Sequence, residues 1–482
     1  MRTDAPNHFP RLTRRHFFQR AGAGFGWLAL QSMLARNGFG ASALNPLAAK
    51  ASHFPAKAKS IIWLFMNGGP SQVDTWDYKP ELQKRDGQPL PGFDAKTGFF
   101  PDAVGPLMKS PFEWQQHGQS GTWGSSLFPK LSRHVDRMAF IHSCFTESNN
   151  HSPALYMMNT GVTRMGHPSV GSWVTYGLGS ESEDLPSFIV MSDPKDRGLP
   201  KGNANNWTAG FLPGVYQGTW LKPKGEPIAN LKRPGDITDQ RQREQLDYLA
   251  ALNRESLAGS AADGELAARI NSFELAYRMQ TAAPEAFDVN KEPESIRQLY
   301  GLDQKHCAHM ALQCLTARRL VERGVRFVQI YSGGMDNQLS WDCHADLVGN
   351  HGGFAAEVDQ PFSALLGDLA QRGLMKDVLV VCVGEFGRLP ISQKGAKPGR
   401  DHNPHAFTAW LAGAGIKGGT HYGATDDIGH KAVVDKVSVH DFHATLLNLL
   451  GMDHEKLTFR QSGLDQRLVG VEACRVVKEI IT

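Results

Sequence analysis

Five short apolar segments constrain the fold of this chain more than any other feature. They cover residues 60–66, 138–143, 187–191, 325–331 and 377–383. Such continuous apolar runs are typical of strands that are buried on both faces of a sheet. Helical patterns at residues 309–323 and 353–371 precede the last two segments. Strands that alternate with long helices predict an α/β fold with a mainly parallel central sheet flanked by helices.

Residues 192–300 interrupt this alternation. Residues 192–235 are rich in Gly, Pro, Asn and Lys and predict a long irregular excursion. Residues 236–300 predict polar, alanine-rich helices that pack outside the core. We therefore expect one main domain over residues 52–482, in which residues 192–300 are an irregular and helical insertion.

The N-terminal segment has the layout of a twin-arginine export signal. Arg14 and Arg15 are followed by Phe17, Phe18 and a short apolar run over residues 21–35 that several glycines interrupt. A bilayer span needs about 20 predominantly apolar residues, so this run predicts a signal that is removed rather than a membrane helix. We expect residues 1–51 to be signal and linker and the twin-arginine translocon to be the partner during export. The mature chain would be periplasmic or otherwise extracytoplasmic, with no transmembrane segment.

Charge and cysteine content argue against two classes of protein. The net charge is +3 and the basic residues are scattered, which argues against a nucleic-acid surface but allows a small phosphate or sulfate ester as substrate. Six cysteines in 482 residues, with no Cys-x-x-Cys, do not form a disulfide scaffold.

Polar side chains follow the first, second, fourth and fifth predicted strands, at the edge where parallel sheets bind their ligands, and the second strand leads to His151. These candidate metal ligands are Asn67 and Asp74 after the first strand, Asp342 and His344 after the fourth, Glu385 after the fifth, and Asp401, His402 and His405 in a later loop. Mixed imidazole and carboxylate ligands favour Zn or Mn over Ca. The sequence therefore predicts one or two divalent metal ions at one edge of the sheet.

Three further residues are candidates for catalysis. His151 follows the second strand and stands before Ser152-Pro153, which predicts a helix N-cap and a first-turn proline. A helix N-terminus suits an oxyanion, so His151 could be a nucleophile, a metal ligand or a loop residue. Arg388 and Arg400 could clamp an oxyanion bidentately.

Several of these features also have structural interpretations. Asp74 could cap a helix, and Glu385 could form a salt bridge with Arg388. His440 and His443 precede an apolar run and are better interpreted as buried structural histidines than as ligands.

Six stretches of the chain resemble a large family of twin-arginine-exported bacterial proteins, the domain of unknown function numbered fifteen hundred and one. They are residues 66–77, 149–154, 341–344, 384–388, 399–402 and 440–447. The order of elements also resembles the alkaline phosphatase and sulfatase superfamily. That resemblance implies an alkaline phosphatase-like fold, divalent metal ions and hydrolysis of sulfate or phosphate esters.

The chain departs from the superfamily pattern at the nucleophile. The superfamily places that residue two positions before a proline at a helix start, where this chain has His151. The sulfatase pattern Cys-x-Pro-x-Arg is absent, so no formylglycine sulfatase is expected. Two functions stay open: a metal-dependent hydrolase of small-molecule or polysaccharide esters, and a catalytically degenerate periplasmic or surface protein that binds a polysaccharide or a partner protein.

Overall fold

A computed structural model describes residues 45–482, except residues 91, 95–97, 224–225, 229–230, 234 and 260–263; within helices it does not describe the side chains of residues 253–271 and 281. The arginine pair of the predicted export signal lies outside the described residues. In the described part of the chain, no helix has the length and apolar character needed to span a bilayer.

A nine-stranded sheet forms the centre of the molecule, in the order β14-β5-β13-β9-β1-β8-β6-β7, with β17 also paired to β5. Its strands are β1 (Ser60–Met66), β5 (Met138–Phe145), β6 (Phe188–Met191), β7 (Thr219–Leu221), β8 (Phe327–Ser332), β9 (Val378–Val383), β13 (Phe407–Gly413), β14 (Thr420–Tyr422) and β17 (Val437–Ser438). Every pairing is parallel except those of β13, which runs antiparallel to both β5 and β9. The predicted α/β fold with a mainly parallel sheet is confirmed.

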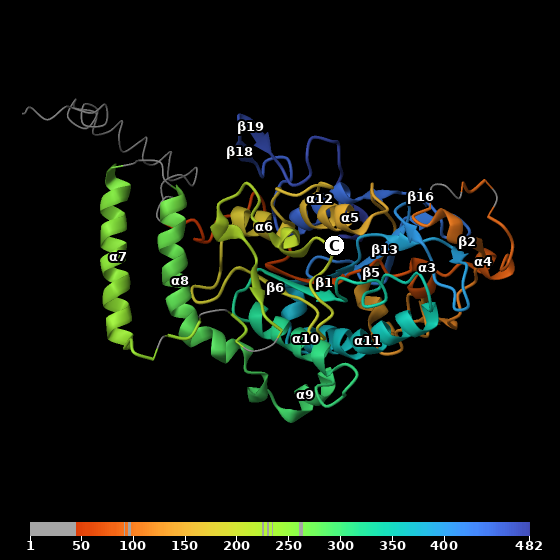
Figure 1. Cartoon of the computed structure of the whole chain (residues 1–482), viewed down its shortest axis with the longest axis horizontal. Helices are drawn as coiled ribbons and strands as arrows, with labels where there is room; N and C mark the ends of the chain where they lie inside the picture. The colour runs from red at the N-terminus through yellow and green to blue at the C-terminus, as the bar shows by residue number, and fades with distance from the viewer. Residues whose placement is uncertain are drawn as a thin grey trace, which may run out of the picture.

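Helices cover both faces of this sheet (Figure 1). One face carries α5 (His151–Thr160), α6 (Val170–Leu178) and α12 (Val439–Leu449), and the other carries α10 (Ala308–Val321) and α11 (Leu347–Gln371). Alternate residues of β1 enter two separate cores: Trp63 and Phe65 pack on one side, and Ile62 and Leu64 on the other. This double burial explains why the strands are apolar throughout.

The insertion returns to the sheet once and then leaves it. After β7, the helices α7 (Asp239–Gly259) and α8 (Gly264–Phe287) stand at one end of the molecule (Figure 1). Arg243 of α7 donates to both carboxylate oxygens of Glu274 on α8, at 3.0 and 2.6 Å. The two helices extend the molecule away from the sheet, but the C-terminal part of α8 joins one of the two cores through Met279, Ala283 and Ala286.

Shorter elements complete the fold. The short helices are α3 (Gln72–Thr75), α4 (Pro80–Lys84) and α9 (Glu294–Tyr300). The short strands are β2 (Val104–Leu107), β3 (Trp114–His117), β4 (Thr122–Ser125), β10 (Gly387–Arg388), β11 (Ile391–Gln393), β12 (His402–Asn403), β15 (Ala424–Thr425), β16 (Ala432–Val434), β18 (Phe459–Gln461) and β19 (Leu464–Gln466).

Candidate metal centre

Three histidines and one aspartate come together from segments that are far apart in the sequence. They are His151, Asp342, His344 and His402, and one ligand atom of each lies within 4.8 Å of the others. Asp342 is central to the group: its Oδ2 lies 2.9 Å from His151 Nε2, and its Oδ1 lies 2.8 Å from His344 Nε2 and 3.2 Å from His402 Nε2. We call these four residues the metal centre because their number and atom types suit a cation.

The other ring nitrogen of each histidine faces a protein oxygen. The Nδ1–O distances are 2.6 Å for His151 and Glu385 Oε1, 2.8 Å for His344 and Gln393 Oε1, and 2.6 Å for His402 and the backbone oxygen of Asn149. Because each of these oxygens can accept a hydrogen bond, a neutral ring with its proton on Nδ1 would leave the Nε2 lone pair for a cation. An outer oxygen that fixes the tautomer in this way is the usual support of a metal-binding histidine.

Two of the inward-facing nitrogens have no hydrogen-bond partner. His151 Nε2 and His344 Nε2 are buried and close to Asp342, but the angles do not fit a hydrogen bond. A buried polar atom that is left unsatisfied destabilises a protein by about 1–3 kcal/mol. A bound cation would satisfy both nitrogens at once, so the side chains fit a metal ion.

The charge states of the group also suit a cation. Burial on its own raises the pKa of Asp342, but Arg388 and the three histidines outweigh burial and hold that pKa well below its usual range. Burial lowers the pKa of His402 well below its ordinary value, although Asp342 opposes this effect. At neutral pH the group therefore offers one carboxylate and at least one imidazole that needs no deprotonation.

Local structure holds His151 and His402 in place. Asn150, rather than the predicted Ser152, is the N-cap of α5, because its side chain accepts the Ser152 N–H. His151 is therefore the first residue of the helix and not a loop residue. His402 lies opposite Arg388 in the β10–β12 pair, and this pairing brings it to Asp342.

A glycine turn after β1 allows the loops to close around the centre. Gly68 has a φ of +109°, and a Cβ at this position would lie 2.4 Å from the Asp342 backbone nitrogen. Its N–H donates to both carboxylate oxygens of Glu385, at 2.9 and 3.1 Å. The glycine therefore lets the β1 turn contact Asp342 and hold Glu385 against His151.

Sequence comparison places the chain in a family. Residues 58–481 match the family described as Protein of unknown function (DUF1501). The chain belongs to this family. No curated protein matches the sequence.

Several solved structures resemble this DUF1501 protein at low identity. The PsFucS1 sulfatase from Pseudoalteromonas sp. is 12% identical with a TM-score of 0.35, over 85% of this chain and 71% of the sulfatase. A phosphonate monoester hydrolase from Silicibacter pomeroyi is 11% identical with a TM-score of 0.34, over 83% of this chain and 74% of that enzyme. An alkaline phosphatase from the Antarctic bacterium TAB5 is 12% identical with a TM-score of 0.33, over 78% of this chain and 96% of the phosphatase.

Glu385 supports the centre from outside it. It is fully buried and contacts His151 and Gly68, and it does not belong to the group of four. The alternative salt bridge between Glu385 and Arg388 does not form. Arg388 Nη2 instead donates to Asp342 Oδ1 at 2.9 Å. Glu385 therefore orients a histidine.

The structure does not bring the other predicted ligands into the group of four. Asn67 donates to the Gly334 carbonyl at 2.5 Å, Asp74 binds Arg400 at 2.6 Å, Asp401 accepts the Phe100 N–H at 3.0 Å, and the His405 ring lies 6.0 Å from that of His430. His440 Nε2 donates to the backbone oxygen of Gly161, the C-cap of α5, and His443 Nε2 donates to that of Met158 in α5, as buried structural histidines would.

The two predicted arginine clamps are positioned for structural roles. Arg388 and Arg400 are fully buried. Arg388 donates to Asp342 and to the carbonyls of Gly68 and Gly69, and Arg400 donates to Asp74 and to the carbonyl of Met108. Their donors already serve the protein, so neither guanidinium is placed to clamp a substrate.

A lysine beside the metal centre, Lys201, was not among the residues predicted from the sequence. Lys201 Nζ lies 2.8 Å from both Asp342 Oδ2 and Asn337 Oδ1, and the lysine side chain is 20% exposed. Lys201 lies in the irregular excursion that follows β6. Glu357 of α11 holds this excursion through Lys195 at 2.6 Å and Arg197 at 2.7 Å. The excursion therefore brings an accessible positive charge to the metal centre.

Two adjacent phenylalanines cover the centre. The Phe99 ring lies 4.6 Å from the His402 ring and the Phe100 ring 4.7 Å from the His344 ring, and these phenylalanines are 37% and 39% exposed. His344 has the most exposed side chain of the four ligands, at 13%. Solvent therefore approaches the centre along an aromatic surface beside His344.

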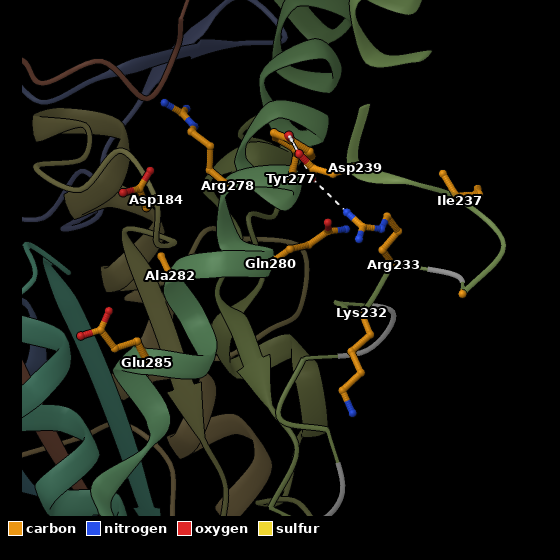
Figure 2. Close-up of a pocket in the computed structure, with 11 residues that line it drawn as sticks. Asp184, Lys232, Arg233, Ile237, Asp239, Tyr277, Arg278, Gln280, Ala282 and Glu285 are labelled. Atoms are coloured by element: carbon orange, nitrogen blue, oxygen red, sulfur yellow. Dashed lines mark hydrogen bonds and ion pairs between the residues drawn. The ribbon is translucent and has the colours of Figure 1, made fainter. Parts of the chain in front are cut away.

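A large cavity lies away from the metal centre. Figure 2 shows a cavity of about 840 Å³ beside α8, lined by residues of α8 and of the segment that leads into α7. Within it Arg233 pairs with Asp239 at 2.9 Å, and the Tyr277 hydroxyl donates to Asp239 at 3.3 Å. This cavity shares no residue with the metal centre, and these charged groups already have partners.

Proposed function

We propose that this DUF1501 protein is a metal-dependent hydrolase of sulfate or phosphate esters. The observation that carries the proposal is the convergence of three histidine Nε2 atoms on one buried carboxylate. Each histidine is held by an outer oxygen, and two of the inward nitrogens lack a partner. A purely structural cluster gains nothing from buried atoms that are left unsatisfied.

The donor set favours Zn or Mn over Ca. Three nitrogens and one carboxylate suit a borderline transition metal, whereas Ca prefers oxygen ligands throughout. One such group is found among the described residues, so the proposal takes one ion. A divalent ion held here supplies Lewis acidity to an ester oxygen and lowers the pKa of a water molecule.

The protein side chains prepare the site for that chemistry. Arg388 keeps Asp342 ionised, and Glu385 fixes the His151 ring at 2.6 Å. Lys201, which is partly exposed and next to Asp342, attracts the anionic oxygens of the ester. Lys201 thus takes the role that the sequence suggested for the two arginines.

Water is the nucleophile in this proposal. Both ring nitrogens of His151 face carboxylates, so His151 is a ligand rather than a nucleophile. Burial raises the pKa of the neighbouring Cys343 thiol to about 12, which leaves no thiolate at neutral pH. The water oxygen forms a bond to sulfur or phosphorus and gives up a proton, the bond from that atom to the ester oxygen breaks, and the leaving alcohol oxygen takes up a proton.

One observation favours a second function. Four protein ligands complete a tetrahedral shell, which is typical of structural zinc sites, whereas catalytic zinc sites usually have three. A closed shell would suit a catalytically degenerate protein that binds a polysaccharide or a partner protein. Hydrolysis at this centre requires a fifth coordination position, which five-coordinate Zn or Mn provides.

Metal analysis and turnover distinguish the two functions. The purified protein should hold about one transition metal ion per chain and hydrolyse members of a panel of aryl sulfates and phosphates. His344→Ala should lose the metal and lower turnover by at least about 100-fold, whereas His421→Ala, an exposed histidine outside the centre, should do neither. Bound metal without turnover supports the second function, and turnover that survives in metal-free His344→Ala contradicts the first.

We also propose that the chain is exported through the twin-arginine pathway. Arg14-Arg15 and the short apolar run support this, and a metal centre built from distant segments suits a route that carries folded proteins. Replacement of both arginines by lysine should keep the protein in the cytoplasm on cell fractionation. Unchanged periplasmic recovery of that variant would contradict the proposal.

A further inference from the structure

A cleft of about 520 Å³ lies beside the metal centre. His402 lines this cleft and is also a metal ligand, so the cleft begins at the site of the chemistry. The side chains that give the cleft its character are Phe93, Asp94, Glu147, His405, His430 and Lys431. Its volume lies within the range of clefts that bind small organic ligands.

Besides His402, two histidines line the cleft, His405 and His430, and both are neutral at physiological pH. Burial lowers the pKa of His430 to about 4, and burial also lowers the pKa of His405. A neutral imidazole offers one hydrogen-bond donor and one acceptor. The cleft therefore presents both kinds of group, together with the Glu147 carboxylate, which accepts, and Lys431, which donates.

The loops that carry these side chains are fixed to each other. Asn403 Nδ2 donates to the His430 carbonyl at 2.9 Å, and the Ala432 N–H donates to the His405 carbonyl at 3.0 Å. The backbone N–H groups of His430 and Lys431 donate to Asp426, at 2.8 and 2.9 Å. The segments that carry His405, His430 and Lys431 are thus held in place before a ligand arrives, which reduces the entropy lost on binding.

An aromatic wall accompanies the polar groups. The Phe93 ring meets the His430 ring edge to face at 5.7 Å, and Phe93 lines the cleft. An apolar ring face can pack on this wall while polar substituents at its edge reach the imidazoles and carboxylates. A purely aliphatic or aryl group would desolvate those polar groups without satisfying them.

We propose that this cleft binds the organic half of the ester and that this half is a neutral, polyhydroxylated ring such as a pyranoside. Hydroxyl groups both donate and accept hydrogen bonds, which matches the mixture of neutral imidazoles, carboxylates and lysine. The exposed carboxylate of Glu147, which lines the cleft, would repel an additional anionic group on the sugar. The assignment of the organic half rests on the proposed hydrolase function, whereas saccharide binding by the cleft does not.

Saccharide binding can be measured apart from hydrolysis. The probes are methyl α-glucopyranoside, cellobiose and glucuronate, titrated into the full chain and followed by saturation-transfer NMR. The two neutral saccharides should bind, and glucuronate should bind at least about tenfold more weakly. Glu147→Gln should weaken the neutral saccharides about tenfold, because one hydrogen bond to a charged group is lost. Glu147 is exposed, so this change does not threaten folding.

Two controls make the result decisive. Glu455→Gln, an exposed glutamate outside the cleft, should leave saccharide binding unchanged. Metal-free His344→Ala should still bind the neutral saccharides, which separates the cleft from the metal centre. The inference would be overturned if the neutral saccharides did not bind, or if Glu147→Gln and Glu455→Gln changed their binding equally. It would also be overturned if glucuronate bound more tightly than the neutral saccharides. Metal-dependent turnover of aryl esters without saccharide binding would retain the proposed function and reject the cleft assignment.

Discussion

Glu385→Gln should weaken metal binding without unfolding the protein. The carboxylate accepts from His151 Nδ1 at 2.6 Å and from the Gly68 N–H at 2.9 and 3.1 Å. Glutamine has nearly the same shape but only one accepting oxygen and no charge, so an amide N–H would face the Gly68 N–H. Loss of one charge-assisted hydrogen bond is worth about 1.5–3 kcal/mol, and loss of an outer partner lowers metal affinity roughly 10- to 100-fold.

Competition with a chromophoric chelator measures this loss directly. The matched control is Asp368→Asn, which removes another fully buried carboxylate that binds Arg318 at 3.0 Å and Arg372 at 2.7 Å. The control should lower the free energy of unfolding and leave metal affinity unchanged. A metal Kd for Glu385→Gln within twofold of the wild type would show that His151 does not hold the ion through the geometry described here.

Three further changes test other parts of the structure. Lys201→Met should lower kcat/KM for anionic esters about 100-fold, because the accessible cation beside Asp342 is lost; Lys201→Arg should restore part of it, and metal content should not change. Arg400→Met should reduce the free energy of unfolding by about 3–5 kcal/mol, because it leaves the buried Asp74 charge unpaired; urea denaturation should show recovery when Asp74→Asn is added. Burial lowers the pKa of His443 to about 3, below its unfolded value of about 6.5, so the folded state binds fewer protons and its stability falls as the pH drops below about 6.5. The free energy of unfolding should therefore fall between pH 7.5 and pH 5.5 by about 1 kcal/mol less in His443→Gln than in the wild type. An equal fall in the two proteins would refute this.

The sheet was largely predictable, because burial on both faces leaves an uninterrupted apolar run in the sequence. All five predicted strands are present, and helices α10 and α11 precede β8 and β9 as expected. The antiparallel strand β13 was missed. It follows a loop rather than a crossover helix, so the alternation of strands and helices does not mark it.

The candidate site was predictable for residues whose place in the fold follows from their position just after a parallel strand. The carboxyl ends of parallel strands meet at one edge, and this brings Asp342 and His344 close to His151. Which polar groups pair with one another depends on packing that the sequence does not reveal. Asp74 and Arg400 are separated by 326 residues and neutralise each other inside the protein, although each separately resembles a site residue.

Lys201, by contrast, lies at the site although the sequence did not predict it. It lies in an excursion without a regular pattern and contacts a residue 141 positions away. Its environment depends on the buried Glu357, which binds Lys195 and Arg197 in the same excursion. Irregular segments that follow a strand at the ligand-binding edge therefore contain candidate site residues even when no motif marks them.

Anomalous diffraction from crystals loaded with Zn or Mn tests the metal centre most directly. The structure predicts one strong peak about 2.0–2.2 Å from the Nε2 atoms of His151, His344 and His402 and from a carboxylate oxygen of Asp342. The Nδ1 atoms should keep their present oxygen partners. Absence of a peak at this position, or a peak that fewer than three of these side chains contact, would contradict the account.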